Sequence, residues 1–471
     1  MNALKQMTEL HQHATPVSGL CQAGNHVGQN PNERADRARL QKRPMFAAAI
    51  VCVAMLITVI GCNSAGRDDA TADSTDQSKS EQTAVAPAEP FTPETYEASA
   101  EDLLAARLPA SEAAAGWVRL FDGHTLFGWE ITGKANFRIE DGAIVVDQGA
   151  QCLMCTSTTW GDFELTLEFK ADEKTNSGIF IRTPLEPDNV DSDCYEINIA
   201  PDDNPFPTGS IVQRQHVDSD AAGPQTPGQW RSMTITAQGQ EISISLGDTV
   251  VCRYTDPVDL AARRIGLQHN SGRVEFRNLK IRPLGLKPML DAELSQWKQY
   301  PDMAAEFTIN EQDELHVVGG SGQLETKQSY GDFFMLADYK IDQPDMNSGI
   351  FFRCIPGDVM MGYECQINND FEPGSRMSPL DCGTGGIFRR QDARVVAGEN
   401  GQWSTLMLHA NENKIAAWVG GIQVSDWEDT REVHENPRKG RRTLPGTIMI
   451  QGHDPGTDVL YRNLQISSLS E

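Results

Sequence analysis

Apolar and polar side chains alternate along most of this chain, and the alternation predicts one strand after another. From Phe163 to Lys170 apolar and polar residues follow each other without a break, so the apolar side chains share one face. This pattern is typical of a half-buried antiparallel strand. Because such runs recur without intervening helical patterns, we expect two-sheet sandwiches rather than a parallel sheet.

Two pairs of runs are predicted to form hairpins. The run 242–246 ends at Gly247-Asp248 before a second apolar run, and the run 415–419 ends at Gly420-Gly421 in the same way. Both dipeptides suit turns that need positive φ.

Helical patterns are scarce. Residues 288–297 are predicted to form a connecting helix, because Pro288 suits an early helical position and Leu294 and Trp297 follow at helical spacing. Short helical turns are also expected near residues 100–115.

The chain contains the same series of motifs twice. Gly161-Asp162-Phe163 and Asn176-Ser177-Gly178 return as Gly331-Asp332-Phe333 and Asn347-Ser348-Gly349, and later motifs follow in the same order. An internal repeat of this length indicates two homologous domains of ordinary size. We place the first domain at residues 111–285 and the second at residues 286–471.

The segment before the repeats is predicted to direct export. Residues 46–60 are apolar and uncharged, which is short for a membrane span but suits an export signal. The run ends in Val59-Ile60-Gly61-Cys62, which resembles a bacterial lipobox. We therefore expect a signal with an extended n-region at 1–61, and a cell-envelope protein anchored to the membrane by lipid on Cys62. The alternative is a buried apolar segment with an incidental cysteine.

Residues 62–110 are predicted to be a flexible tether. They are rich in Ala, Ser, Thr, Asp, Glu and Pro and have almost no aromatic residues, so they bury too little apolar surface to fold. A tether of this length holds the folded domains away from the membrane.

The net charge excludes some classes of binding partner, and the cysteine content indicates little about the chemistry of the protein. The formal net charge of −26 argues against nucleic acid and anionic lipid surfaces as partners, and keeps an exported protein soluble. Cys152 and Cys155 have the spacing of a metal or redox pair, but no second pair completes a zinc site. We expect buried or disulfide-paired cysteines, with Cys354 and Cys365 as one candidate bridge. The oligomeric state is left open.

The ordered motifs resemble one known family. In chain order they are Leu120-Phe121-Asp122-Gly123 with Trp129, then Gly-Asp-Phe, Asn-Ser-Gly-Ile-Phe-x-Arg, Tyr-Glu, Thr-Gly-x-Ile, Gly-x-Trp and Phe/Tyr-Arg-Asn-Leu. This series resembles the 3-keto-disaccharide hydrolase domain family and covers residues 117–284 and 296–468. The resemblance implies an all-β protein of two tandem concanavalin A-like jelly-roll β-sandwiches that act on carbohydrate, cleaving glycosides oxidised to a ketone at C3.

The implied reaction makes definite demands on a site. A ketone at C3 acidifies the C2 proton, so a modest base can remove it, and the enolate then expels the anomeric oxygen. The site needs a base, a donor or divalent metal for the enolate oxygen, and a proton for the leaving group. No fixed pair of carboxylates is needed, unlike in ordinary glycosidases. The sequence establishes no cofactor, and a divalent metal is the one candidate.

The second repeat carries the preferred catalytic residues. Alternation from Tyr363 places Glu364, Gln366 and Asn368 on one face, and Gln451 and His453 share a face on another strand. We expect Glu364 and His453 to act as an acid/base or metal-ligating pair. Arg353 would polarise the ketone, and Gln366, Asn368 and Gln451 would bind hydroxyl groups.

The alternative for these residues is a purely structural role. Glu364 and Arg353 can form an ion pair on the sheet, and His453 with Asp454 can cap a loop. Asn347 is most simply a turn residue.

The first repeat either lacks the proton-transfer group of the second repeat or uses a different one, and in the first case it binds sugar without cleaving it. It keeps Arg182, Glu196, Asn198 and Gln268 as substrate-binding candidates, but Asn270 occupies the position of His453. Catalysis is therefore predicted mainly in the second repeat. The alternatives for the whole chain are a non-catalytic, lectin-like envelope lipoprotein and a surface scaffold.

Overall fold

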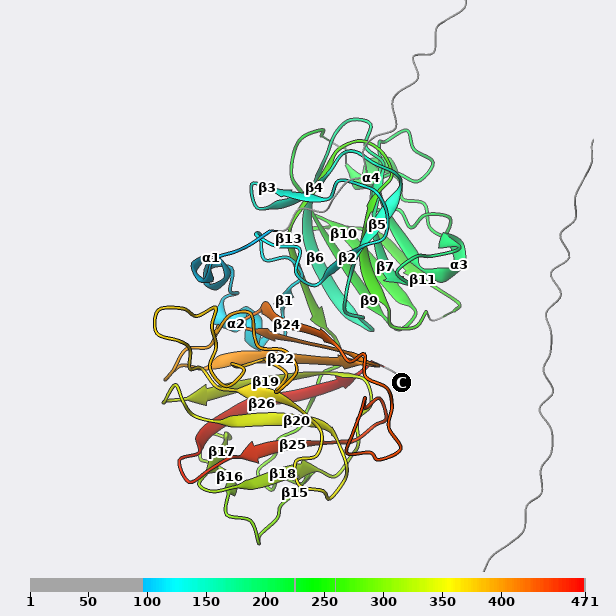
Figure 1. Ribbon diagram of the computed structural model, residues 1–471. Coiled ribbons are helices and arrows are strands. Elements are labelled where there is room, and N and C mark those ends of the chain that lie inside the picture. The colour runs from blue at the N-terminus through cyan, green and yellow to red at the C-terminus, as the bar shows by residue number, and fades with distance from the viewer. Residues whose placement is uncertain (1–95, 224–225, 259, 470–471) are drawn as a thin grey trace, which may run out of the picture. The chain divides into compact units, whose positions relative to one another are not determined.

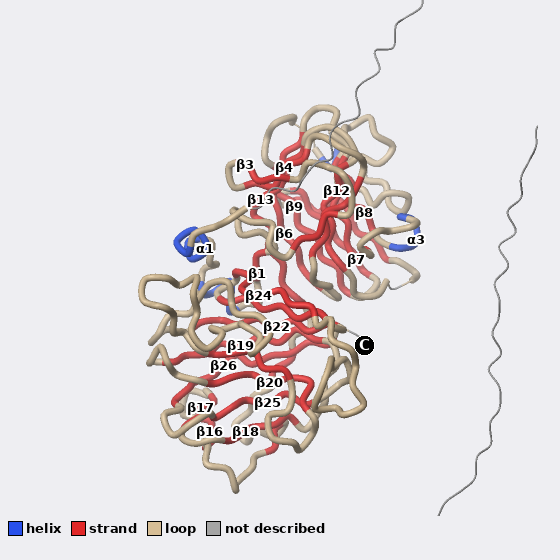
Figure 2. The backbone as a smooth tube through the Cα atoms, viewed as in Figure 1, coloured by secondary structure: helices blue, strands red, loops and turns tan. Residues whose placement is uncertain are grey.

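The computed structural model describes residues 96–223, 226–258 and 260–469, and these residues form mainly strands (Figures 1 and 2). The predicted export signal, Cys62 and the tether up to residue 95 lie outside the described residues. No helix among the described residues is long and apolar enough to cross a membrane.

The first repeat is a sandwich of an eight-stranded and a five-stranded antiparallel sheet. The larger sheet has the order β11-β10-β9-β6-β13-β4-β3, with β1 paired to β13, and comprises β1 (Val118–Arg119), β3 (Arg138–Glu140), β4 (Ala143–Val146), β6 (Phe163–Ala171), β9 (Arg231–Gln238), β10 (Glu241–Leu246), β11 (Thr249–Thr255) and β13 (Val274–Pro283). The smaller sheet has the order β2-β5-β12-β7-β8, and comprises β2 (Trp129–Ile131), β5 (Cys152–Thr156), β7 (Ser177–Thr183), β8 (Tyr195–Ile199) and β12 (Arg264–His269). Short helices α3 (Val190–Asp193) and α4 (Ser219–Ala222) lie in its loops.

The second repeat has the same architecture. Its eight-stranded sheet has the order β16-β17-β26-β19-β22-β23-β24, with β14 paired to β26, and comprises β14 (Lys287–Pro288), β16 (Glu306–Ile309), β17 (Leu315–Val318), β19 (Phe333–Ile341), β22 (Ser404–Asn411), β23 (Lys414–Val419), β24 (Ile422–Glu428) and β26 (Asp458–Ser468). Its five-stranded sheet has the order β15-β18-β25-β20-β21, and comprises β15 (Trp297–Lys298), β18 (Gly322–Thr326), β20 (Ser348–Cys354), β21 (Tyr363–Ile367) and β25 (Thr447–Gly452). The expectation of two tandem jelly-roll sandwiches is confirmed.

The strand predicted from strict alternation is β6, and its burial follows the sequence pattern. Phe163, Leu165, Leu167 and Phe169 are buried, whereas the residues between them are partly exposed. Burying one large apolar side chain contributes about 1.5–3 kcal/mol, so this face anchors the first core.

Both predicted hairpins are present. The pair β10–β11 turns at Gly247 with φ of 58°, and β23–β24 turns at Gly420 and Gly421 with φ of 58° and 83°. Glycine adopts these backbone conformations at little steric cost.

The predicted connecting helix at residues 288–297 is wrong. Pro288 belongs to β14, and the chain then turns, with Asp291 Oδ1 accepting from the Ser295 backbone N–H at 2.7 Å. Leu294 has a φ of 52°, which interrupts any right-handed helix. The apolar spacing arises because Met289, Leu294 and Trp297 are anchored in the second core.

Helical turns occur where they were expected, in α1 (Ala100–Ala105) and α2 (Ala110–Ala114). Ser99 and Asp102 form a capping box at the start of α1. Leu103 is only 1% exposed and belongs to the core of the second repeat. Ordered structure therefore begins before residue 110, where the predicted tether was to end.

The two sandwiches share apolar contacts. Trp160 of the first repeat stacks on Phe334 of the second with ring centroids 4.6 Å apart, and both belong to one buried cluster with Trp418. Polar contacts flank this cluster, including the Arg394–Asp122 ion pair at 2.9 Å.

The cysteines in the described part of the chain are free, and all but Cys152 are buried. Cys365 lies opposite Ile350 in the register of β20 and β21. Cys354 is four residues further along β20, roughly 13 Å at the rise of a strand. The candidate bridge between Cys354 and Cys365 is therefore absent.

Candidate functional site

Each five-stranded sheet turns one face to the core and presents polar groups on the other, which we call the outer face. In the second repeat Tyr363, Cys365 and Ile367 of β21 point into the core, so Glu364 and Gln366 point outward. Gln366 lies opposite Gly349 on β20, and Glu364 lies opposite Phe351. The predicted shared face of Glu364 and Gln366 is therefore present.

Glu364 fills a space that a glycine leaves. A Cβ built on Gly349 would stand 2.8 Å from Glu364 Oε1, so the carboxylate lies across Gly349. Burial, with a smaller contribution from the negative charge of Asp381, raises the pKa of Glu364 to about 7. A carboxyl group of this kind can exchange a proton near neutral pH.

Amide groups lie near this carboxyl group on the outer face. Gln366 Nε2 and Asn347 Nδ2 both donate to Asp381 Oδ2, at 2.9 Å and 2.5 Å. Their oxygens, and Oε1 of Gln451, are buried and have no hydrogen-bond partner among the described residues. Unpaired buried acceptors are costly, so three of them on one face indicate that water or a ligand supplies the donors.

The first repeat builds the same arrangement. A Cβ on Gly178 would stand 3.1 Å from Glu196 Oε1. Burial raises the pKa of Glu196 to about 7, against the opposing hydrogen bond with Gln268. Asn198 donates through Nδ2 to the Phe206 carbonyl, and its Oδ1, like Oε1 of Gln268, is buried without a partner in the described structure.

A cavity opens beside Gln268 on the outer face of the first repeat. Its volume is about 340 Å³, and its walls include Leu153 of β5, Phe180 of β7 and Val190 of α3. The volume and the mixture of apolar walls with few polar groups are typical of small-molecule sites.

The arginine candidates take structural roles. At Arg353 the backbone has a φ of 48° and the register of β20 shifts, so the alternation that would have placed it beside Phe351 is broken. Its fully buried side chain donates to Asp332 at 2.7 Å and to the carbonyls of Glu412 and Arg442. Arg353 therefore does not join the carboxyl group of Glu364, either as a ketone polariser or as an ion-pair partner.

Arg182 repeats this pattern in the first repeat. It has a φ of 49° and donates to Asp162 at 3.0 Å and to the Gly239 and Leu260 carbonyls. It is likewise held within the framework rather than in the site.

His453 and Asn368 lie just outside the strands that carry the site. His453 follows the last residue of β25, its side chain is 43% exposed, and its Nδ1 pairs with Asp454 Oδ2 at 2.8 Å. Asn368 accepts from the Asp370 backbone N–H at 2.9 Å through Oδ1. The structure brings Glu364, Gln366 and Gln451 together, but it pairs His453 with Asp454 rather than with Glu364.

Three features of the site were missed by sequence reasoning. Gly178 and Gly349 are strand residues that give room to a carboxylate, although their Asn-Ser-Gly motifs suggested turns. Asp381, which orients two amides, follows no strand alternation and left no signal except its acidity. The close approach in each repeat could have been suspected from glycine inside a strand.

No group of three or more His, Cys, Asp or Glu side chains that could hold a metal ion occurs in the part of the chain that the structure describes.

The two sandwiches, each with a polar outer face on its smaller sheet, belong to the class of concanavalin A-like jelly rolls. The chain belongs to the family described as the 3-keto-alpha-glucoside-1,2-lyase-like domain, whose model matches residues 116–282 and 285–467. The resemblance drawn from the motifs is thereby confirmed, as is the tandem arrangement.

Solved structures with similar folds include two from Parabacteroides distasonis that carry the name glycosyl hydrolase. One is 19% identical, with 38% of this chain and 98% of that chain covered and a TM-score of 0.34; the other is 25% identical, with 36% and 99% covered and a TM-score of 0.30. The carbohydrate-binding module CBM66 from Bacillus subtilis is 17% identical over 33% of this chain and 95% of its own, with a TM-score of 0.26. A comparison with curated proteins finds no match.

Proposed function

We propose that this protein is a carbohydrate-active lipoprotein that cleaves 3-keto-glycosides by removal of the C2 proton, elimination and hydration. The observation that carries the proposal is a largely desolvated glutamate with a pKa near 7 beside unpaired amide oxygens, present at the same position in both repeats. Membership of the 1,2-lyase-like family supports the same reaction.

The reaction balances without any added oxidant or reductant. The base takes the C2 proton, and the C2–H electrons form an enolate with the C3 ketone. The enolate collapses, the C1–C2 double bond forms, and the C1–O bond breaks as the leaving group takes a proton. Water then adds across the double bond and yields the free 3-keto sugar.

Glu364 and Glu196 act as the bases in this scheme. A carboxyl group with a pKa near 7 is a stronger base than an ordinary glutamate and is still ionised in part at neutral pH. After proton transfer the same group is a neutral acid that can protonate the leaving oxygen. One residue can therefore serve both proton transfers.

The amide oxygens orient the sugar. Gln366 and Gln451 in the second repeat, and Asn198 and Gln268 in the first, each present an acceptor that the protein leaves unpaired. Sugar hydroxyl groups are donors of the right kind.

Both repeats are assigned the reaction. The reason for preferring the second repeat was His453, and that side chain pairs with Asp454 on an exposed loop. The equivalent glutamates, glycines and amides are present in both sheets, and a cavity opens beside Gln268 in the first.

The proposal is tested by incubating the full chain with a 3-keto-disaccharide and measuring the released sugar. Glu196→Gln and Glu364→Gln should each remove the contribution of one repeat, and the double variant should lose about a hundredfold to ten-thousandfold in rate. Glu164→Gln, on the eight-stranded sheet and paired with Arg282, is the matched control. Full turnover in the double variant would refute the assignment.

A non-catalytic, lectin-like function is the second candidate. The unpaired amide oxygens bind hydroxyl groups whether or not a bond is broken. Saturable binding of a 3-keto-disaccharide by the wild-type chain, with no product at any pH, would favour this function over catalysis.

The proposal includes attachment to the cell envelope through lipid on Cys62, motivated by the lipobox-like tetrapeptide that ends at this residue. Cys62→Ala should abolish lipid labelling and leave an uncleaved precursor. Unchanged processing in that variant would exclude this anchor.

A further inference from the structure

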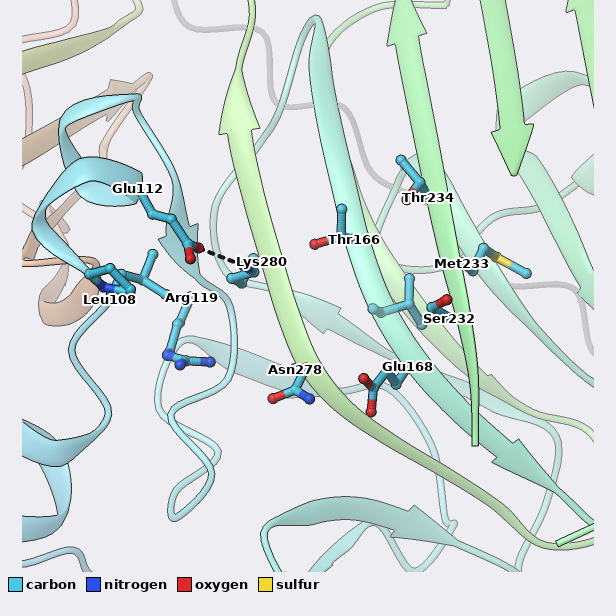
Figure 3. A pocket seen from close by; sticks show the side chains of 12 residues that line it. Leu108, Glu112, Arg119, Thr166, Glu168, Ser232, Met233, Thr234, Asn278 and Lys280 are labelled. Atoms are coloured by element: carbon cyan, nitrogen blue, oxygen red, sulfur yellow. Dashed lines mark hydrogen bonds and ion pairs between the residues drawn. The ribbon is translucent and has the colours of Figure 1, made fainter. Parts of the chain in front are cut away.

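A second cavity lies on the opposite side of the first repeat, on the outer face of its eight-stranded sheet. It has a volume of about 450 Å³ and lies between strands β6, β9 and β13 and the segment that carries α2 and β1 (Figure 3). It is distinct from the glutamate site, which lies on the five-stranded sheet.

The polarity of this face is specific to the first repeat. Thr166 of β6 and Thr234 of β9 point into the cavity. The motif alignment places Leu336 and Met407 at the equivalent positions of the second repeat, where both are buried in the apolar cluster shared by the sandwiches. The sandwich itself therefore does not require hydroxyl groups here.

Arg119 supplies a partly buried positive charge to this cavity. Its Nε donates to the Ala106 carbonyl at 2.6 Å, and no carboxylate of the described residues forms an ion pair with it. Burial lowers the pKa of Arg119, although Glu112 and Asp122 oppose the shift. A desolvated guanidinium without a carboxylate is suited to a planar anion, which it can bind through two N–H groups.

The other charged groups of the cavity are already paired. Glu112 Oε2 accepts from Lys280 at 2.6 Å, as Figure 3 shows, and Glu168 Oε2 accepts from Arg277 at 2.6 Å. The charge left over in the cavity is that of Arg119. The cavity therefore favours a ligand with one anionic group.

Neutral polar groups complete the lining. Thr166 Oγ1 is buried and has no hydrogen-bond partner in the described structure. Asn278 has a φ of 54° at the irregularity in β13, and its side chain is exposed at the cavity. The corresponding Asn463 of the second repeat donates to the Ala114 carbonyl at 2.9 Å. These groups can form hydrogen bonds with hydroxyl groups of a ligand.

We propose that this cavity is a binding site for a small polyol with one anionic group, a sugar acid or a sugar phosphate. The anionic group pairs with the Arg119 guanidinium, and the hydroxyl groups bond to Thr166 Oγ1 and the Asn278 amide. No aromatic side chain lines the described cavity, so an apolar ligand gains little there.

The test is calorimetric titration of the full chain with sodium glucuronate, glucose 6-phosphate and glucose. At least one of the two anionic sugars should bind saturably, at least about tenfold more tightly than glucose, because only it engages the guanidinium. The tighter of the two identifies the anionic group.

Two variants of residues that line the cavity, and one of a residue outside it, test whether the ligand binds in this cavity. Arg119→Gln should weaken binding about tenfold or more, and Thr166→Val, which keeps the side-chain shape, should weaken it by about threefold to tenfold. Arg282→Gln, on the same sheet but outside the lining, should leave it unchanged. The Glu196→Gln, Glu364→Gln double variant should also bind normally, which separates this site from the proposed active site.

The proposal is overturned by absence of saturable binding for both anionic sugars, by equal binding of glucose, or by wild-type affinity in both Arg119→Gln and Thr166→Val. Loss of binding in the double glutamate variant would also overturn it, because the ligand would then occupy the five-stranded sheet.

Discussion

The carboxylate of Glu364 lies across Gly349 on the neighbouring strand, at a point where a Cβ would stand 2.8 Å from Oε1. Glu196 and Gly178 have the same relationship in the first repeat, with a separation of 3.1 Å. In each sheet the glycine has no side chain, and the glutamate carboxylate lies in the space that this leaves. The position of the proposed base therefore depends on the glycine.

Gly349→Ala should move the Glu364 carboxylate without unfolding the protein. The clash is with the end of a flexible side chain, and Gly349 has no positive φ, so the cost in stability should be about 1 kcal/mol or less. Turnover by the second repeat, measured in a Glu196→Gln background, should fall at least about tenfold because a misplaced base loses its geometry. Gly161→Ala is the control, since its nearest contact would be 3.7 Å away. Equal activity of the two variants would contradict the role of Gly349.

The raised pKa values predict a pH-dependent stability. Below about pH 4.5 both glutamates are protonated in the folded and the unfolded chain, and their burial carries no penalty. As the pH rises from there through 7 the unfolded chain releases these protons first, so the folded state loses stability. At about 1.4 kcal/mol per pKa unit, each glutamate costs about 3 kcal/mol above pH 7.

Glu364→Gln should therefore stabilise the protein at pH 8 and leave its stability unchanged at pH 4, as measured by urea unfolding. The exposed Glu173→Gln serves as the control at both pH values. A stabilisation of equal size at pH 4 and pH 8 would show that the effect is not ionisation of Glu364.

Asp381 is predicted to act as a positioning residue for the second repeat. Asp381→Ala frees the amides of Gln366 and Asn347, so KM for a 3-keto-disaccharide should rise by about tenfold, equivalent to about 1.4 kcal/mol. Loss of its negative charge should also shift the rising limb of the rate–pH profile to lower pH, because Asp381 helps to raise the pKa of Glu364. These kinetics are measured in the Glu196→Gln background. Glu372→Ala, exposed in the same loop, is the control, and an unchanged KM and pH profile would dismiss this role.

The parts of the structure that local rules control were predictable from the sequence. The alternation in β6 depends only on which face is buried, and so does the common face of Glu364 and Gln366. The turns at Gly247 and Gly420 follow from the conformational freedom of glycine. The doubled motifs defined two copies of one fold without any structural information.

The errors occurred where distant contacts override the local pattern. Arg353 was predicted to polarise the substrate ketone, but its left-handed backbone is stabilised by Asp332 and by carbonyls far along the chain. Leu294 and Trp297 have helical spacing because a turn anchors both in the core. Asp381 joins the site through a loop whose path no periodicity describes.

The segment before the first repeat is predicted to stabilise the second repeat. The Leu108 backbone N–H donates to the Gly420 carbonyl at 2.9 Å. Leu103 is buried in the second core. A fragment of residues 285–471 lacks this segment and therefore loses both contacts.

Leu103→Ala in the full chain should destabilise the second repeat by about 2–5 kcal/mol, the usual cost of removing a buried leucine side chain. Leu444→Ala is the matched control, because Leu444 is 80% exposed, and it should change stability by less than about 0.5 kcal/mol. Thermal melting of both variants, followed together with a 285–471 fragment, measures the contribution of the segment. The fragment should melt below the full chain because it exposes the apolar surfaces that Leu103 and the first repeat cover. If Leu103→Ala melts like Leu444→Ala and the fragment like the full chain, the segment does not stabilise the second repeat.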